Sequence, residues 1–163
     1  MVETPKSILL VEDDENDVFF LTYAFEAAGV VNPVVVARDG QEAMEYLGGV
    51  GRFSDRSRHP FPGLVLLDLK LPVKTGLDVL RWIRQSGMRN LLVIVLTSSK
   101  DPHDVDEAYR LGARSFLVKP LTISERLETA KVIKRYWLEL NQLPSTGPAA
   151  ATTDNSPPAV SGV

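Results

Sequence analysis

The sequence predicts an α/β fold, a doubly wound five-stranded parallel sheet with helices on both of its faces. Five short apolar runs alternate with five stretches in which apolar residues recur at three- and four-residue spacing. The apolar runs are continuous rather than alternating, as in parallel strands that are buried on both faces. A closed eight-stranded α/β barrel needs roughly 250 residues, whereas this chain has 163.

The first half of the chain is predicted to hold two strand–helix pairs and then a long loop. The strands are expected at residues 8–11 and 34–37, where the apolar runs lie. Glycines are the expected helix stops, Gly29 after the first helix and Gly48-Gly49 after the second. The stretch 49–63 contains three glycines, two prolines and no helical or strand period. It is therefore predicted to be a loop.

The second half is predicted to hold the three remaining strands, at 64–67, 91–96 and 115–118. Apolar positions at helical spacing predict two helices between them: Leu77, Leu80, Trp82 and Ile83 in one, and Val105, Ala108, Tyr109 and Leu111 in the other. A last helix is expected to begin near Thr122. Thr122 and Glu125 have the spacing of a capping box, in which each side chain binds a free backbone N–H of the helix start.

The chain is predicted to consist of one folded domain, residues 1–140, and a disordered tail, residues 141–163. From Asn141 onward the composition shifts to Pro, Ala, Ser, Thr and Gly with almost no charge. Such a segment buries too little apolar surface to offset the entropy lost on ordering. The tail is also too short to be a second domain.

Composition narrows the class of protein. The hydrophobic share of 44% and charged share of 24% are those of a globular protein with its own core. No apolar run is long enough to span a bilayer, and the N-terminus lacks a basic segment followed by an apolar stretch. We therefore expect a cytoplasmic protein that does not enter a membrane. The net charge of −3 argues against direct binding to nucleic acid.

Polar side chains follow four of the five predicted strands, at the edge where an open parallel sheet carries its working site. In chain order they are Glu12-Asp13-Asp14, Asp68, Thr97-Ser98 and Lys119-Pro120. An isolated aspartate at a strand end is usually a turn or helix-cap residue. Several carboxylates at one edge repel one another, which favours a site that holds a cation.

The expected cation is Mg²⁺. The chain has no cysteine, and His59 and His103 lack the paired spacing of zinc or copper ligands. Carboxylate oxygens suit Mg²⁺, which keeps several waters and completes its coordination with phosphate oxygens.

Four motifs in this order and spacing carry a resemblance to a known family: Leu10-Val11-Glu12-Asp13-Asp14; Leu66-Leu67-Asp68-Leu69-Lys70-Leu71-Pro72 with Gly76; Val95-Leu96-Thr97-Ser98-Ser99; and Val118-Lys119-Pro120. The set resembles response-regulator receiver domains of two-component phosphorelays, over residues 6–140. The loop at 51–60 and the Leu-Asp-Leu-Lys-Leu-Pro stretch further resemble stand-alone regulators that partner bacterial phytochrome histidine kinases. The resemblance implies the flavodoxin-like receiver fold.

The resemblance also implies roles for the acidic residues. Asp68 is the expected phosphoacceptor, which takes a phosphoryl group from a phosphohistidine of a sensor histidine kinase. Glu12, Asp13, Asp68 and the backbone carbonyl of Lys70 are the expected Mg²⁺ ligands. Asp14 is expected to cap the first helix instead.

The remaining roles concern neutralisation and switching. By the same resemblance Thr97 hydrogen-bonds the phosphoryl oxygens and Lys119 pairs with their charge. Thr97 and Phe116 are the expected switch residues, which move inward after phosphorylation, although Phe116 also suits plain core packing. The Lys119–Pro120 bond is a candidate for the cis form.

The residue two positions after Asp68 argues against a hydrolytic enzyme. An aspartate-nucleophile phosphatase needs a second aspartate two residues after its nucleophile, and Lys70 occupies that position. The chain is therefore not predicted to be an enzyme, beyond assisting its own phosphotransfer and autodephosphorylation. The open alternative is a non-phosphorylated scaffold that keeps the receiver fold for protein interaction.

The last helix bears on self-association. An inward stripe is expected: Ile123, Leu127, Ala130, Ile133 and Trp137. Val132 and Tyr136 fall outside this stripe, four residues apart, and form a candidate exposed patch. A homodimer through this helix remains open.

Overall fold

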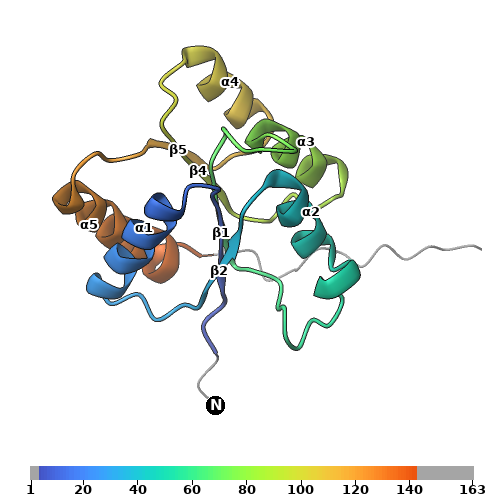
Figure 1. Cartoon of the computed structure of the whole chain (residues 1–163), viewed down its shortest axis with the longest axis horizontal. Helices are drawn as coiled ribbons and strands as arrows, with labels where there is room; N and C mark the ends of the chain where they lie inside the picture. Colours follow the sequence, from blue (N-terminus) through green and yellow to red (C-terminus); the bar gives the residue numbers. More distant parts are fainter. Residues whose placement is uncertain (1–3, 143–163) are drawn as a thin grey trace, which may run out of the picture.

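Five parallel strands form one sheet in the order β2-β1-β3-β4-β5, as the sequence predicts (Figure 1). The strands are β1 (Ile8–Val11), β2 (Val34–Ala37), β3 (Leu64–Leu67), β4 (Val93–Thr97) and β5 (Ser115–Val118). The computed structural model describes residues 4–142, so the tail predicted to be disordered lies outside the described residues from 143 onward.

Helices cover both faces of the sheet (Figure 1). They are α1 (Glu15–Ala27), α2 (Gly40–Gly48), α3 (Gly76–Gln85), α4 (Pro102–Arg110) and α5 (Ile123–Val132). Helices α1 and α5 pack on one face, and α2, α3 and α4 pack on the other. The predicted doubly wound α/β fold is thus confirmed. Among residues 4–142, no helix combines the length and apolar character needed to cross a membrane.

The continuous apolar strands supply both halves of the core. On β1, the side chains of Leu9 and Val11 join the cluster beneath α2, α3 and α4. Those of Ile8 and Leu10 join the cluster beneath α1 and α5. All four are buried, because successive side chains of a strand point to opposite faces and both faces are covered.

Strand β4 differs from its prediction. The apolar run begins at Leu91, but the strand begins at Val93 and ends at Thr97, and the first hydrogen bond to β3 is the one that the Leu92 carbonyl accepts from the Val65 N–H (2.9 Å). The N–H of Leu91 is bonded to the Met88 carbonyl in a turn (3.1 Å). Leu91 and Leu92 are nevertheless buried in the core. Leu91 is thus apolar because it is buried, although it lies before the first hydrogen bond between the strands.

The loop at 49–63 is held to α2 by several side chains, of which Arg56 makes the most hydrogen bonds to backbone carbonyls. The Arg56 guanidinium donates hydrogen bonds to the carbonyls of Tyr46 and Leu47, each at 2.7 Å, and to that of His59 at 3.1 Å. Carbonyls at a helix C-terminus have no partner within the helix. Arg56 provides two of these missing partners, and the loop is ordered around it.

The last helix meets its predictions in part. The Thr122–Glu125 capping box is present, and Ala130 and Ile133 are fully buried. A π-helical segment, η2 (Ile133–Leu140), continues α5. Ile123, however, is 61% exposed, so its place in the inward stripe was wrong. Periodicity gives the face of a helix only, and at this first turn that face borders an open groove beside α1.

Candidate functional site

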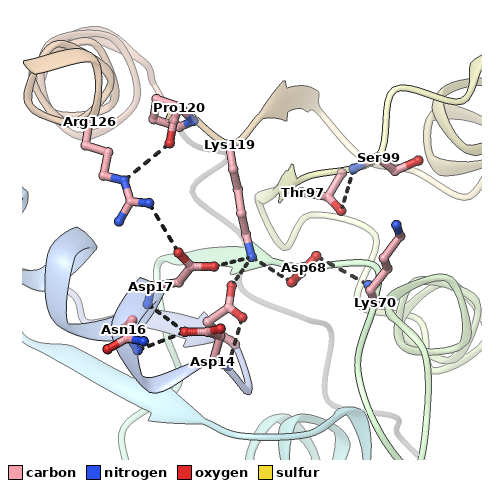
Figure 2. A network of polar contacts seen from close by, with 11 residues as sticks. Asp14, Asn16, Asp17, Asp68, Lys70, Thr97, Ser99, Lys119, Pro120 and Arg126 are labelled. Carbon is pink, nitrogen blue, oxygen red and sulfur yellow. Dashed lines mark hydrogen bonds and ion pairs between the residues drawn. The ribbon is translucent and has the colours of Figure 1, made fainter. Parts of the chain in front are cut away.

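The carboxyl ends of β1, β3, β4 and β5 bring together polar residues from distant parts of the sequence (Figure 2). Glu12, Asp68 and Thr97 are buried, and each directly follows or ends its strand. Carboxylate oxygens of Glu12, Asp13 and Asp68 all lie within 4.8 Å of one another. The edge predicted from the strand ends is therefore where these side chains meet.

The Lys119 ammonium occupies the centre of this group (Figure 2). Its Nζ lies 2.5 Å from Glu12 Oε2, 2.8 Å from Asp68 Oδ2 and 3.0 Å from Asp17 Oδ2. An ammonium has three protons, so these three carboxylates use its full donor capacity. The side chain of Lys119 is only 16% exposed, which makes each contact stronger than a surface ion pair.

Burial and charge act in opposite directions on the ionisable groups. Burial raises the pKa of Glu12 to about 7, although the hydrogen bonds from Lys119 and from the Asp14 N–H favour the charged form. Burial lowers the pKa of Lys119, but hydrogen bonds to Asp68, Glu12 and Asp17 outweigh it and hold that pKa above its usual value. Lys119 is thus a permanent cation beside the acidic cluster.

A close backbone approach fixes the loop that carries Asp68. The N–H of Gly76, at the start of α3, donates to the Leu69 carbonyl at 2.9 Å. A Cβ on Gly76 would lie 2.2 Å from the Asp68 carbonyl oxygen, far inside van der Waals contact. The absence of a side chain at Gly76 therefore allows α3 to begin directly against the Asp68 backbone.

The turn between Asp68 and α3 contains a strained residue. Val73 has a φ of 67°, a conformation that a β-branched residue rarely adopts. The Lys74 N–H donates to the Pro72 carbonyl at 2.8 Å, which makes a tight three-residue turn. Val73 is exposed, so packing of its side chain in the core is not what imposes this conformation.

Asp14 has the capping role expected of it. Its Oδ1 accepts hydrogen bonds from the N–H groups of Asn16 at 2.8 Å and Asp17 at 3.1 Å, which confirms it as the N-cap of α1. Of the three consecutive acids, only Glu12 and Asp13 are then left for the acidic cluster.

The backbone of Lys70 borders the Asp68 carboxylate. Its N–H donates to Asp68 Oδ1 at 3.3 Å. The side chain of Lys70 is exposed, and its ammonium has no dashed contact with the other residues drawn in Figure 2. The Lys119–Pro120 peptide bond is trans, since no peptide bond among residues 4–142 is cis. The cis form considered for it was wrong.

The two predicted switch residues occupy neighbouring strands. Thr97 is fully buried at the end of β4, and its hydroxyl accepts a hydrogen bond from the Ser99 N–H at 3.4 Å. Phe116 is half-buried on β5 and packs against the core beneath α3 and α4. Its N–H donates to the Tyr109 hydroxyl at 3.1 Å. Ser99 in turn donates to Asp104 of α4 at 2.6 Å.

Two residues of the site were not found from the sequence. Asp17 contacts Lys119 with one carboxylate oxygen and Arg126 of α5 with the other, at 3.3 Å. Arg126 also donates to the Pro120 carbonyl at 3.2 Å and lies over the Phe20 ring. Asp17 stands in the first turn of α1, three residues after the N-cap Asp14, where an acidic residue is ordinary. Arg126 is 109 residues from Asp17, and no local pattern points to it.

The donor set fits a hard divalent cation. Three carboxylates converge, two of them buried, and oxygen is the ligand atom that Mg²⁺ and Mn²⁺ prefer. Lys119 supplies one positive charge against Glu12, Asp13 and Asp68 together. The negative charge that remains uncompensated there favours a divalent cation.

Comparison with known proteins gives a consistent result. The family model described as "Response regulator receiver domain" matches residues 8–131. The chain is 38% identical over 148 residues to the probable methanogenesis regulatory protein FilR2 of Methanothrix harundinacea, covering 90% of this chain and 92% of that protein. It is 34% identical over 142 residues to the response regulator Rcp1 of Synechocystis sp., covering 86% of this chain and 95% of Rcp1.

Solved structures agree with the sequence matches. The phosphorylated cyanobacterial phytochrome response regulator RcpA superposes with a TM-score of 0.79 at 34% identity, over 86% of this chain and 99% of RcpA. The Mn²⁺-bound form of Rcp1 gives a TM-score of 0.77 at 34% identity, over 86% of this chain and 100% of Rcp1. Both likenesses extend over nearly the whole of the solved chains.

Proposed function

This chain belongs to the response regulator receiver domain family, and we propose from that premise that it accepts a phosphoryl group on Asp68 from a sensor histidine kinase. Receiver-domain response regulators act in two-component signalling, and relatives of this chain include a phytochrome response regulator. A kinase of the phytochrome type is accordingly the proposed donor. The transfer is proposed to change a surface that binds another protein.

The observation that carries this proposal is the position of the Asp68 carboxylate. It is buried, within 4.8 Å of the Glu12 and Asp13 oxygens and 2.8 Å from the Lys119 ammonium. Phosphoryl transfer needs a positioned oxygen nucleophile and positive charge around the equatorial oxygens of the phosphoryl group. Asp68 supplies the nucleophile. Lys119, together with a cation held by the acidic cluster, would supply the positive charge.

Glu12, Asp13, Asp68 and the Lys70 carbonyl are the proposed ligands of Mg²⁺. The carboxylate cluster supports this assignment, as does the likeness to Rcp1, whose solved form is Mn²⁺-bound. When bound, the cation neutralises the charge of the phosphoryl donor and of the acidic cluster. It would leave Lys119 to pair with the remaining phosphoryl charge.

The residues of the chain then have separate tasks. Lys119 holds the Asp68 carboxylate in place before transfer and pairs with the phosphoryl oxygens after it. The Thr97 hydroxyl, buried one strand away, is proposed to donate to a phosphoryl oxygen, which draws the end of β4 inward. Phe116 is proposed to move inward after Thr97, because it lies on the neighbouring strand β5, which pairs with β4.

Incubation with acetyl phosphate and Mg²⁺, read by intact-protein mass spectrometry, tests the proposal. We expect a mass gain of one phosphate in the wild type, no gain with Asp68→Asn, and a retained gain with Asp14→Asn. Asp14 is a matched control, because asparagine also caps helices and Asp14 lies outside the acidic cluster. No gain in the wild type would instead favour the scaffold that binds partners without phosphorylation.

Lys70→Ala is expected to shorten the lifetime of the phosphorylated form. The backbone N–H of Lys70 contacts the Asp68 carboxylate and its side chain is exposed, and the ammonium is proposed to hold the phosphoryl oxygens against attack by water. Loss of mass after removal of acetyl phosphate measures the lifetime. Lys74→Ala, which alters an exposed lysine farther along the same loop, should leave it unchanged. An equal lifetime in Lys70→Ala and wild type removes this role.

A homodimer through the last helix is the further proposal for partners. Val132 and Tyr136 are 59% and 53% exposed and four residues apart, so they lie on one side of the helix. Sedimentation analysis should show a Val132→Ser/Tyr136→Ser variant as more monomeric than the wild type. A wild type that is monomeric at all concentrations would contradict the dimer.

A further inference from the structure

A cavity of about 310 Å³ opens between the C-terminal ends of α3 and α4, below the starts of β4 and β5. It lies at the edge of the sheet opposite to Asp68, because the strands run from this edge toward the acidic cluster. Its floor is apolar and mostly buried: Leu80, Ile83, Leu91, Val93, Leu111 and Ala113. Its volume is at the lower end of the roughly 300–1,000 Å³ typical of small-molecule sites.

The charged residues that line this cavity all have the same sign. They are Arg84, Arg89 and Arg114, and no aspartate or glutamate lines it. The chain as a whole carries a net charge of −3, so three cations around one opening depart from its overall charge. Helix C-termini contribute only about half a negative charge each. The two helix ends therefore leave this rim positive.

Neighbouring arginines differ from these three. Arg81 and Arg110 both pair with Glu107, and Arg81 also pairs with Asp78. Within residues 4–142, by contrast, no carboxylate forms an ion pair with the three arginines of the cavity. Their charge is uncompensated at the point where the cavity opens.

Two of these guanidinium groups are held in position. Arg84 donates to the Arg110 carbonyl across the rim, and Arg114 donates to the Arg89 carbonyl at 3.3 Å. Each of these bonds uses one of the five N–H donors of an arginine. The hydrogen bond restricts the rotation of each guanidinium, so an anion that binds the remaining donors costs less side-chain entropy than it would at an unbonded surface arginine.

Tyr109 forms the wall toward β5. It lines the cavity, and its hydroxyl accepts the hydrogen bond from the Phe116 N–H. The ring offers an aromatic surface to an occupant, and the Phe116 amide provides a local spectroscopic reporter of that wall. An apolar floor, an aromatic wall and a fixed cationic rim together select for a molecule with both an apolar body and a negative group.

We propose that this cavity binds a small organic phosphate whose apolar or aromatic body fills the floor while its phosphate meets Arg84, Arg89 and Arg114. Guanidinium groups match phosphate in a planar, two-point geometry. Inorganic phosphate alone would leave the apolar floor empty, and a neutral apolar compound would leave the rim unpaired. The proposal is independent of phosphorylation at Asp68.

Titration with 1-naphthyl phosphate, followed by calorimetry and by amide NMR shifts, tests it. We expect saturable binding with a Kd below about 1 mM. Inorganic phosphate and 1-naphthol should each bind at least about tenfold more weakly, since each keeps only half of the contacts. Shifts should centre on Gly112, Ala113 and Phe116. Binding that shifts Thr97 instead, or no saturation, would overturn the proposal.

Arg89→Gln is the most informative variant, because the Arg89 side chain makes no hydrogen bond or ion pair within residues 4–142, so its loss costs the fold little. Binding should weaken several-fold while the thermal midpoint stays unchanged. The double variant Arg84→Gln/Arg114→Gln should weaken it further. Arg58→Gln, an exposed arginine in the distant loop, is the matched control. Equal binding by Arg89→Gln and the wild type would show that these arginines only brace the helix ends, and would overturn the proposal.

Discussion

Gly76→Ala is expected to destabilise the fold by about 3 kcal/mol and to abolish phosphorylation at Asp68. The new Cβ would lie 2.2 Å from the Asp68 carbonyl oxygen and 2.7 Å from the Leu69 Cα. Both neighbours are backbone atoms, which no rotamer change can move aside. Relief requires that α3 or the Asp68 segment shift, and such a shift moves the nucleophile away from Lys119. Urea unfolding and the acetyl phosphate mass gain measure the two effects.

Gly48→Ala is the matched control for Gly76→Ala. Gly48 ends α2, its φ is not in the left-handed region, and a Cβ there would make ordinary van der Waals contacts with the Trp82 ring at 3.6 Å and with Val50 Cγ1 at 3.8 Å. Alanine costs less backbone entropy than glycine in a helix, so stability should rise by up to about 1 kcal/mol. A Gly76→Ala protein with wild-type unfolding and a full mass gain would show that the α3 start is free to move.

Lys119→Met is expected to slow phosphorylation by acetyl phosphate at least about 100-fold. It removes the ammonium that contacts Asp68 at 2.8 Å and leaves the carboxylates of Glu12, Asp17 and Asp68 facing one another. Breaking a buried ion pair on one side costs about 3–5 kcal/mol, a range that partial exposure of Lys119 reduces here. Stability should therefore fall, and fall less in Mg²⁺, which offsets the same repulsion.

Lys131→Met controls for the loss of a lysine charge. Lys131 pairs with Glu128 on the surface of α5 at 3.1 Å, with both side chains more than half exposed. Exposed pairs contribute about 0–1 kcal/mol, so neither stability nor phosphorylation should change much. If Lys119→Met gained phosphate as fast as the wild type, the ammonium would have no part in the transfer.

The strands were predictable because the apolar runs that mark them in the sequence arise from the burial of both faces of the sheet. Four of the five predicted strands match the structure residue for residue, since a run such as 64–67 is apolar because both faces are covered. The exception, β4, shows the limit of this signal. Leu91 is almost as buried as the strand that follows, but its N–H closes a turn with Met88 and only the next residue, Leu92, begins the hydrogen bonding to β3. Side-chain burial therefore does not mark the first paired residue.

The site was predictable only where strand order determines position. Asp68 and Lys119 stand at the ends of strands, and the ends of parallel strands share one edge, so their meeting follows from topology. Asp17 and Arg126 come from helices, whose rotation and tilt against the sheet depend on packing. The same reason accounts for Ile123, which has the helical spacing of the inward stripe but is exposed, because its side of the helix borders a groove at the first turn.

The arginine-lined cavity lay beyond sequence reasoning altogether. Its arginines come from α3, from the turn before β4 and from the turn before β5, and each is unremarkable in its own segment. Only the side-by-side packing of α3 and α4 gathers them around one opening. Charge clusters of this kind require the tertiary structure, because no spacing rule connects residues in separate loops.

The Arg56 attachment of the 49–63 loop has a consequence for folding speed. The two α2 carbonyls that Arg56 binds, those of Leu47 and Tyr46, belong to residues only nine and ten positions earlier. Closing so short a segment costs little chain entropy, since that cost grows with the logarithm of loop length. The loop can therefore order as soon as the end of α2 has formed, before β3 joins the sheet. The long loop at 49–63 is thus held by contacts that are local in sequence, the kind that slow folding least.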